Sequence, residues 1–279
     1  MASNSIRNAE SKVINKSRQT ANTPLVEGLA RFGYIARGLV YAVIGLLAFQ
    51  LAFSGGGKVT NQTGAIQMIG AQPFGKILLI LLVIGLFGYA IWGVIRALLD
   101  PLGRGSDAKG LLARAGFLTS AISYAALGLL AFNYVTGYGS ASTGKSPDIL
   151  VQLLSQPFGK WLILLLGLFW VGAGLGQIYT AWTQDFEKDL RPNLPANEKV
   201  WSERLGRVGY AARGIVFIVI GVLTLQGGAA ASAKNSVGFD DALLQMAHGP
   251  YGTLVLGVVA LGVLAFGIYS MLCARWMKI

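Results

Sequence analysis

One stretch decides the fold, because it occurs three times along the chain. It reads Arg31-Phe-Gly-Tyr-Ile-Ala-Arg-Gly-Leu-Val-Tyr, then Arg114-Ala-Gly-Phe-Leu-Thr-Ser-Ala-Ile-Ser-Tyr, then Arg207-Val-Gly-Tyr-Ala-Ala-Arg-Gly-Ile-Val-Phe. The copies align without gaps. A second block follows each copy, as Gln72-Pro-Phe-Gly-Lys, as Gln156-Pro-Phe-Gly-Lys and, degraded, as His248-Gly-Pro-Tyr-Gly. Such recurrence predicts tandem copies of one structural unit.

Each copy lies beside long apolar stretches, two per unit. Only 13% of the 279 residues are charged, against about 25% in soluble domains. Each stretch approaches the roughly 20 residues that a helix needs to cross a bilayer, and none alternates as barrel strands do. The sequence therefore predicts an all-α polytopic membrane protein with six transmembrane helices, arranged as three parallel two-helix repeats that could close into a pseudo-threefold bundle. The stretches run approximately over Leu29–Phe53, Ile77–Leu99, Leu111–Val135, Trp161–Trp182, Val208–Leu225 and Leu254–Cys273.

The chain divides into a tail and three repeats. We place the repeats at residues 25–104, 105–192 and 193–279. Residues 1–24 are predicted to form a polar cytoplasmic tail without regular structure. This tail contains no apolar run of the kind that a cleavable signal peptide needs, so we expect the first helix to direct insertion.

The charges predict an orientation. Of the 23 Lys and Arg, 18 fall on the side that holds both termini, and the other five are Lys58, Lys76, Lys145, Lys160 and Lys234. The positive-inside rule then places both termini in the cytoplasm. A basic cytoplasmic face also suits anionic lipid. Basic and aromatic residues do not interleave as in nucleic-acid-binding proteins, so we expect no nucleic-acid partner.

The turn block and the segment before it predict how each second helix begins. Proline suits the first turn of a helix, where its missing N–H costs little. The segments Gly64–Gln72, Pro147–Gln156 and Gly238–Met246 are predicted to be short amphipathic helices at the outer surface. Within the spans, Gly172-x-x-x-Gly176 and Gly116-x-x-x-Ser120 predict close helix contacts. The structural residues of the turns are predicted to be Pro73, Gly75, Pro157, Gly159, Pro250 and Gly252.

The repeated arginines are the candidate binding residues. Arg37 and Arg213 lie six positions beyond the first arginine of their repeats, about 9 Å deeper along a helix. One interpretation is an anion or lipid-headgroup site that Ser120 interrupts in the middle repeat. The other is that the side chains extend to the interface or bond the C-terminal carbonyls of a neighbouring helix. Glutamates four residues before Arg31 and Arg207 predict ion pairs. The candidate set is Arg31, Arg37, Arg114, Arg207 and Arg213.

The residue types that usually perform chemistry are scarce. No Asp or Glu lies in the middle of a predicted span, where proton- or sodium-coupled transporters usually place ionisable groups. His248 and Cys273 are the single histidine and the single cysteine, so we expect no haem, metal or other cofactor. With no catalytic constellation, we expect no enzymatic activity.

The repeated blocks resemble those of a bacterial membrane family, domain-of-unknown-function family 1206. That family is similar in having tandem helix pairs with an R-x-G-[YF]-x-A-[RK]-G motif and a Q-P-[FY]-G turn. The resemblance covers roughly residues 25–275, and the first and third repeats fit the motif fully. The middle repeat departs at Ser120 and Ala121, and the third turn lacks the glutamine. The resemblance implies the fold and a bacterial cytoplasmic or internal membrane, but no activity.

Two functions remain open from sequence. The absence of catalytic groups favours a structural, accessory or assembly component of a membrane complex, with a membrane-protein partner. The alternative is a passive transporter or channel for a small anion or lipid headgroup, with its path between the three hairpins.

Overall fold

The computed structural model describes residues 23–54, 60–137, 158–229, 239–248 and 251–278. Within these ranges the regular elements are helices. Six of them are long and apolar enough to cross a membrane, so the chain is an all-α integral membrane protein. The long helices are α2 (Pro24–Ser54), α4 (Gly75–Leu99), α5 (Ala108–Thr136), α7 (Gly159–Thr183), α8 (Ala196–Ala229) and α10 (Gly252–Trp276), and the short ones are α3 (Gln62–Gly70), α9 (Phe239–His248) and the 3₁₀ helix η2 (Asp185–Asp189).

Some predictions fall outside the described ranges. They concern the tail up to residue 22, the segment Pro147–Gln156 and the turn prolines Pro157 and Pro250. Their structure is therefore not described.

Each second helix begins at a turn that the sequence block specifies. Phe74 and Tyr251 occupy equivalent turn positions and both have positive φ, 61° and 58°. A Cβ added to Gly75 would overlap the carbonyl oxygen of Gly70, which ends the preceding short helix. Only glycine fits there, and Gly252 is placed in the same way against Ala247. Pro73 lies two residues before α4 begins, and so in the turn rather than in the first helical turn that we predicted.

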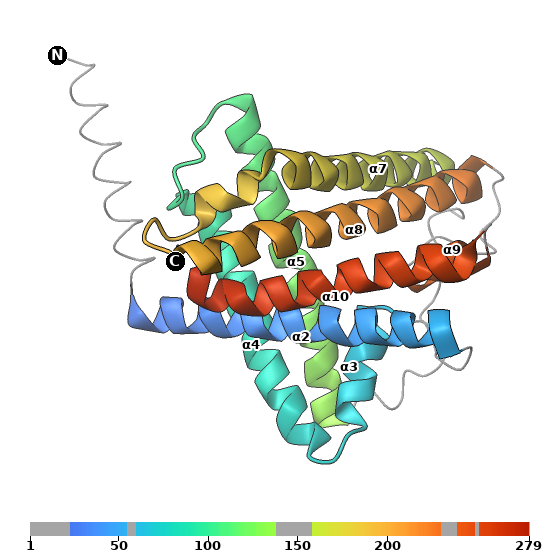
Figure 1. Cartoon of the computed structure of the whole chain (residues 1–279), viewed down its shortest axis with the longest axis horizontal. Coiled ribbons are helices and arrows are strands. Elements are labelled where there is room, and N and C mark those ends of the chain that lie inside the picture. The colour runs from blue at the N-terminus through green and yellow to red at the C-terminus, as the bar shows by residue number, and fades with distance from the viewer. Residues whose placement is uncertain (1–22, 55–59, 138–157, 230–238, 249–250, 279) are drawn as a thin grey trace.

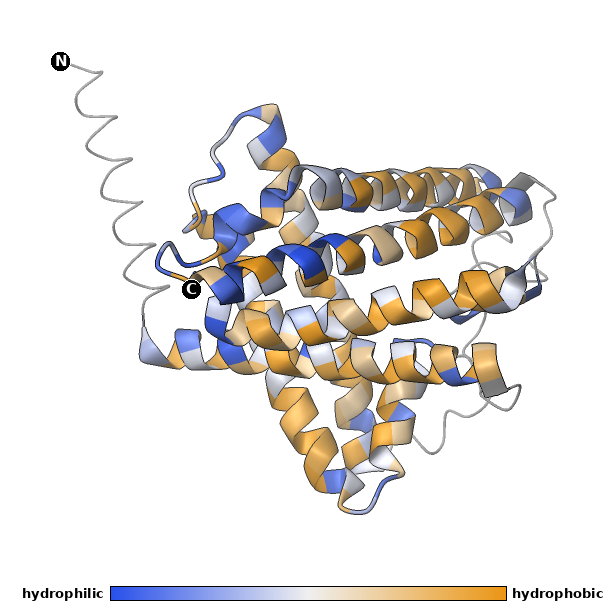
Figure 2. Cartoon of the chain, in the orientation of Figure 1, coloured by the Kyte–Doolittle hydropathy of each residue, from blue (hydrophilic) through white to orange (hydrophobic). Residues whose placement is uncertain are grey.

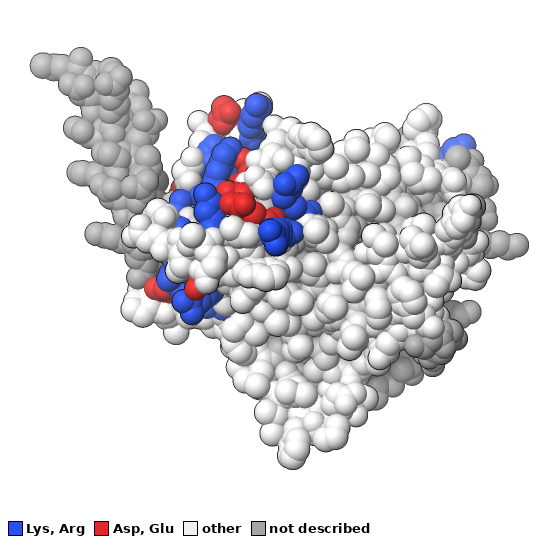
Figure 3. Space-filling view, viewed as in Figure 1, with Lys and Arg blue, Asp and Glu red and all other residues white. Residues whose placement is uncertain are grey.

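The helices are arranged around one charged end. Figure 1 shows α2, α10, α8 and α7 side by side along the long axis, while α4 and α5 cross behind them steeply and reach the bottom of the view with α3. Apolar residues cover the lengths of the helices in Figure 2, and charged residues gather in Figure 3 where α8 begins and α10 ends. We call this the charged end; α2, α5 and α8 begin there and α4, α7 and α10 end there.

The repeats pack cyclically. The first helix of each repeat packs most extensively on the second helix of the repeat before it: α5 on α4, α8 on α7, and α2 on α10. The last of these contacts joins the first repeat to the third, as the predicted bundle requires. In the described part of the chain, α5 and α7 share no extended packing surface. The arrangement departs there from regular threefold symmetry.

Glycines allow these contacts, at positions other than some that we predicted. A Cβ on Gly38 of α2 would lie 2.6 Å from the carbonyl oxygen of Gly267 in α10. The equivalent pair, Gly214 of α8 and Gly174 of α7, approach as closely. By contrast, a Cβ on Gly116, Gly172 or Gly176 would meet nothing within 4 Å, so the contacts predicted from their spacing do not form within the described chain.

The short helices α3 and α9 do not simply lie on an outer surface. Their predicted apolar faces pack inward on the long helices, and Ile66 and Leu243 are completely buried. Asn61 donates a hydrogen bond of 3.3 Å from its Nδ2 to Oδ2 of Asp240 and so links the two short helices. They cover the end of the bundle opposite to the charged end.

Candidate anion-binding site

Three arginines from three helices lie among aromatic rings inside the bundle. Arg37 of α2 is 5% exposed, and its Nε donates to Oγ of Ser270 in α10 at 2.7 Å. Its Nη1 donates to the hydroxyl of Tyr89 in α4. The guanidinium carbon lies 4.6 Å from the centre of the Tyr89 ring and 5.2 Å from that of Phe266. Arg37 thus joins α2, α4 and α10.

Arg96 of α4 approaches the same tyrosine. It is 6% exposed, and its Nη2 donates to the Tyr89 hydroxyl at 3.3 Å. Its guanidinium carbon lies 4.4 Å from the centre of the Phe117 ring, on α5. Its Nε is buried without a hydrogen-bond partner. The Tyr89 hydroxyl therefore accepts hydrogen bonds from two arginines.

Arg213 of α8 differs because, among the described residues, its guanidinium interacts with aromatic rings and not with hydrogen-bond acceptors. Its guanidinium carbon lies 4.4 Å from the centre of Phe266, 5.0 Å from Phe217 and 5.1 Å from Tyr41. It is half-buried, its Nε is buried without a partner, and it bonds no other described residue. Phe266 therefore contacts the equivalent arginines of the first and third repeats.

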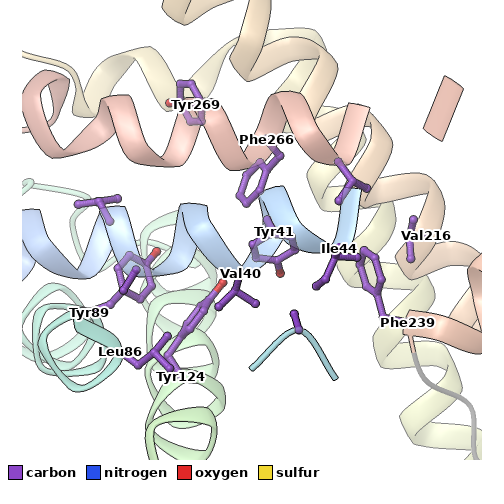
Figure 4. Packing of buried hydrophobic residues seen from close by; sticks show 14 of the residues in the cluster. Val40, Tyr41, Ile44, Leu86, Tyr89, Tyr124, Val216, Phe239, Phe266 and Tyr269 are labelled. Carbon is purple, nitrogen blue, oxygen red and sulfur yellow. The ribbon is translucent and has the colours of Figure 1, made fainter. Parts of the chain in front are cut away.

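Figure 4 shows the aromatic surroundings. Tyr41, Tyr89, Tyr124 and Phe266 come from α2, α4, α5 and α10 and lie around the same part of the interior. The hydroxyls of Tyr41 and Tyr124 bond no other described residue. They are hydrogen-bond donors near a group of cations, as an oxyanion site requires.

The rings stabilise the cations without neutralising them. A charged side chain in the middle of a membrane costs about 3 kcal/mol on insertion scales, and a desolvated cation–π contact returns about 2 kcal/mol. None of the three arginines bonds a carboxylate in the described ranges. Their charges are therefore not paired with a bonded carboxylate in the described chain, which leaves them able to attract an anion.

The other candidate arginines perform a different task. Arg114 donates from Nε to the carbonyl oxygen of Ala97 at 2.7 Å and from Nη2 to that of Leu98 at 3.1 Å. Arg31 donates to the carbonyl oxygen of Ala274 and pairs with Glu27 as predicted. Both arginines thus bond carbonyls that end the neighbouring second helix, a contact that we had proposed for Arg37 and Arg213 instead.

The third repeat lacks this cap within the described residues. Arg207 is exposed and bonds none of them. The ion pair predicted between Glu203 and Arg207 does not form, because Glu203 instead faces Lys199 at 3.9 Å. Of the five candidate arginines, the structure brings only Arg37 and Arg213 together.

Sequence reasoning missed Arg96. It lies near the end of the predicted span Ile77–Leu99, where an arginine alone in an apolar run was the available signal. It is not part of the repeated motif, since the other repeats have Thr180 and Cys273 at the corresponding distance from the turn proline. Its place beside Arg37 and Phe117 depends on how α4 crosses α2 and α5, which the sequence alone does not give.

Comparisons with known proteins agree with the repeat structure. The model of the family described as Domain of Unknown Function (DUF1206) matches three times, at residues 32–100, 115–184 and 208–277. The chain is also similar to "Uncharacterized protein YxxB" of Bacillus subtilis (strain 168), with 32% identity over 250 residues, 89% of this chain and 90% of the relative. No solved structure matches.

Proposed function

The chain belongs to the DUF1206 family, and on that premise we propose that it is a passive carrier for a small anion or an anionic lipid headgroup. One observation carries the proposal: the guanidinium groups of Arg37, Arg96 and Arg213 gather within the spans without a carboxylate bonded to them in the described chain. Arg213 is the group that would bind the anion, because its hydrogen-bond donors are not engaged by other described residues.

Both ends of the bundle are closed by buried side chains, which supports a carrier rather than an open channel. At the far end, α3 and α9 bury Ile66 and Leu243 completely. At the charged end, Phe186 of η2 is 3% exposed, and its ring stacks on Tyr210 at 5.3 Å between centres. An anion would pass only when one of these seals moves. With the charged end in the cytoplasm, as the positive-inside rule suggests, η2 would be the cytoplasmic seal.

Flux in proteoliposomes tests the proposal. The vesicles would be assayed for uptake of radiolabelled inorganic phosphate and for transbilayer movement of headgroup-labelled phosphatidylglycerol. Arg213→Gln should reduce one of these fluxes about tenfold, the effect of losing about 1.4 kcal/mol of anion binding. Arg207→Gln removes the same charge from an exposed residue and is the matched control. Wild-type flux no greater than that of empty vesicles, or equal flux in both variants, would overturn the proposal.

A second function, an accessory subunit that binds another membrane protein, is favoured by α7. Gly172 and Gly176 are exposed on one of the least buried spans, and nothing lies within 4 Å of a Cβ added to either. Small residues at this spacing allow a partner helix to approach. Gly172→Leu with Gly176→Leu should therefore release a partner on native gels in mild detergent without disturbing the fold. Gly28→Leu, an equally open glycine on α2, is the control; co-migration unchanged by the α7 variant would exclude this surface.

A further inference from the structure

We propose a second anion site, separate from the arginine cluster, that binds a phosphate group at the charged end. It is a cavity of about 400 Å³ between the linker that precedes α8 and the end of α10. None of its residues belongs to the interior cluster. The cavity is lined by Arg191, Pro192, Asn193, Leu194, Pro195, Glu198 and Arg275.

The walls of the cavity are held in place by the backbone. The linker is attached to the C-terminal residues through a bridge between Leu190 and Met277. The backbone N–H of Arg191 also donates to the carbonyl oxygen of Trp276 at 2.8 Å. Prolines at 192 and 195 restrict the linker further. A site fixed in this way loses little conformational entropy when a ligand binds.

Two guanidinium groups reach the cavity from different elements. Arg191 belongs to the linker and its side chain is 46% exposed; Arg275 belongs to the last turn of α10 and its side chain is 74% exposed. Within the described residues each has one carboxylate partner, Glu27 at 3.6 Å from Arg191 and Glu198 at 2.9 Å from Arg275. A guanidinium has five N–H donors, so one carboxylate leaves several for another anion.

The carboxylate that lines the cavity already has two hydrogen-bond partners. Glu198 accepts a hydrogen bond of 2.7 Å from Nε1 of Trp276 in addition to that from Arg275. The amide of Asn193 bonds no other described residue and offers a further donor. Two arginines and an amide around one space fit the tetrahedral oxygens of a phosphate, which arginine binds in a bidentate manner.

The location favours a phosphate that is carried by a lipid. The cavity lies where the apolar span of α10 ends, next to Trp276. Leu194 is half-buried and packs on the hydrophobic core, and the two prolines add apolar surface. Basic pockets at the ends of transmembrane helices bind anionic headgroups. A phosphodiester could occupy the cavity while its acyl chains remain in the bilayer.

Thermal unfolding of the full chain in detergent tests the site. The additives are phosphatidylglycerol, diacylglycerol, which lacks the phosphate, and inorganic phosphate. Phosphatidylglycerol should raise the unfolding temperature of the wild type, and Arg191→Gln with Arg275→Gln should weaken its apparent affinity at least about tenfold, because two charged hydrogen-bonding groups are lost. Arg204→Gln with Arg207→Gln removes two exposed charges from the same end and should leave the effect intact.

The outcomes separate the sources of the phosphate. A response to phosphatidylglycerol alone identifies a lipid headgroup, and a response to inorganic phosphate as well identifies a site for free phosphate too. Whatever response remains in Arg213→Gln should still be lost when Arg191→Gln and Arg275→Gln are added, which distinguishes this site from the interior cluster. If the double glutamine variant is unstable, Arg191→Lys with Arg275→Lys keeps both charges and should still bind less tightly. Three outcomes would overturn the proposal. They are an equal response to diacylglycerol, no response to phosphatidylglycerol or to inorganic phosphate, and an undiminished response in Arg191→Gln with Arg275→Gln.

Discussion

At the scale of single residues, the interior depends on rings that serve as counter-groups for arginine. Phe266 is completely buried and contacts Arg37 and Arg213 from the first and third repeats. Tyr89, which occupies the same place in the first repeat, bonds Arg37 and Arg96. The middle repeat has Ala173 at this position and Ser120 in place of the arginine, so the cation and its ring are lost together.

Replacing Phe266 by leucine tests this dependence. The substitution keeps most of the apolar volume but removes both contacts between the ring and the arginines, so the free energy of unfolding should fall by about 2–4 kcal/mol. Phe169→Leu is the control, because that ring is 49% exposed and contacts Trp170 rather than an arginine. Thermal unfolding of both variants in one detergent would measure the difference. Equal losses would show that the contacts of Phe266 with the two arginines add nothing to stability.

A second residue-scale prediction concerns pH and lies outside the spans. Burial raises the pKa of Asp189, and this outweighs the lowering effect of Arg104, which donates to its carboxylate at 2.7 Å. The pKa of Asp185 is lowered instead. Burial raises this pKa, but hydrogen bonds from Lys188 and Arg104 lower it by more. A raised carboxylate pKa means that the folded chain holds the proton more tightly. The stabilisation from Asp189 is therefore complete below its unfolded pKa and is lost as pH rises through the folded value.

Asp189→Asn removes this titration and keeps a polar side chain. The difference in unfolding temperature, wild type minus variant, should shrink as pH rises from about 4 toward neutrality. Asp185→Asn should show the reverse trend, because the stabilisation from Asp185 is lost as pH falls. Parallel pH series of the three proteins would check both signs. A difference that grows with pH in the Asp189 series would mean that Arg104 outweighs burial.

At the scale of helices, the same motif position meets different surroundings in different repeats. A Cβ on Gly209 of α8 would lie 2.7 Å from Cα of Phe266, and one on Gly33 of α2 would lie 2.5 Å from the backbone nitrogen of Tyr89. On α5 the equivalent Gly116 faces open space. The glycine is required where the first helix of a repeat crosses its own second helix, and the middle repeat has no such crossing in the described part.

Alanine substitutions should separate these cases. Gly209→Ala should lower the free energy of unfolding by about 1–3 kcal/mol, since a backbone neighbour has to shift. Gly116→Ala should be neutral or stabilising by up to about 1 kcal/mol, because alanine favours helices. The measurement is thermal unfolding in detergent. A similar loss at Gly116 would indicate that α5 and α7 pack together in the membrane.

The elements themselves were largely predictable, and their side-chain partners were not. The apolar run Leu29–Phe53 predicted most of α2, because lipid requires a continuous apolar segment. The run Val208–Leu225 missed the first turns of α8, which begins at Ala196. Those turns are polar and are held by ion pairs such as that between Glu198 and Arg275. The arginine at position 96 was visible in the sequence, but its neighbours depend on helix crossing, which composition does not encode.

At the scale of the whole molecule, the chain closes between its first and last spans. The packing of α2 on α10 predicts a specific disulfide. A Cβ on Gly257 would lie 3.9 Å from Cβ of Ala52, close to the mean separation of about 3.8 Å across a disulfide. The Phe53 ring also lies next to Gly257. It is 62% exposed, so it can move away from the new side chain.

Ala52→Cys with Gly257→Cys, in a Cys273→Ala background, should therefore oxidise within the monomer. Labelling with maleimide-polyethylene glycol after denaturation would show two thiols before oxidation and none afterwards. Ala52→Cys paired with Gly172→Cys on α7 is the control and should keep both thiols. Persistent labelling of the first pair would argue that the three hairpins form an open row.

This closure has a consequence for synthesis. Arg37 donates a hydrogen bond to Ser270 of α10, a residue that lies 233 positions further along the chain. At about 5–20 residues per second, the ribosome needs roughly 10–50 seconds to supply it. During that interval α2 is already made, while its guanidinium lacks the partners that α10 brings. The nascent protein thus holds a cation in the bilayer whose contacts with Ser270 and Phe266 form only when the last helix is made, and chains that stop before α10 should be substrates for membrane quality control.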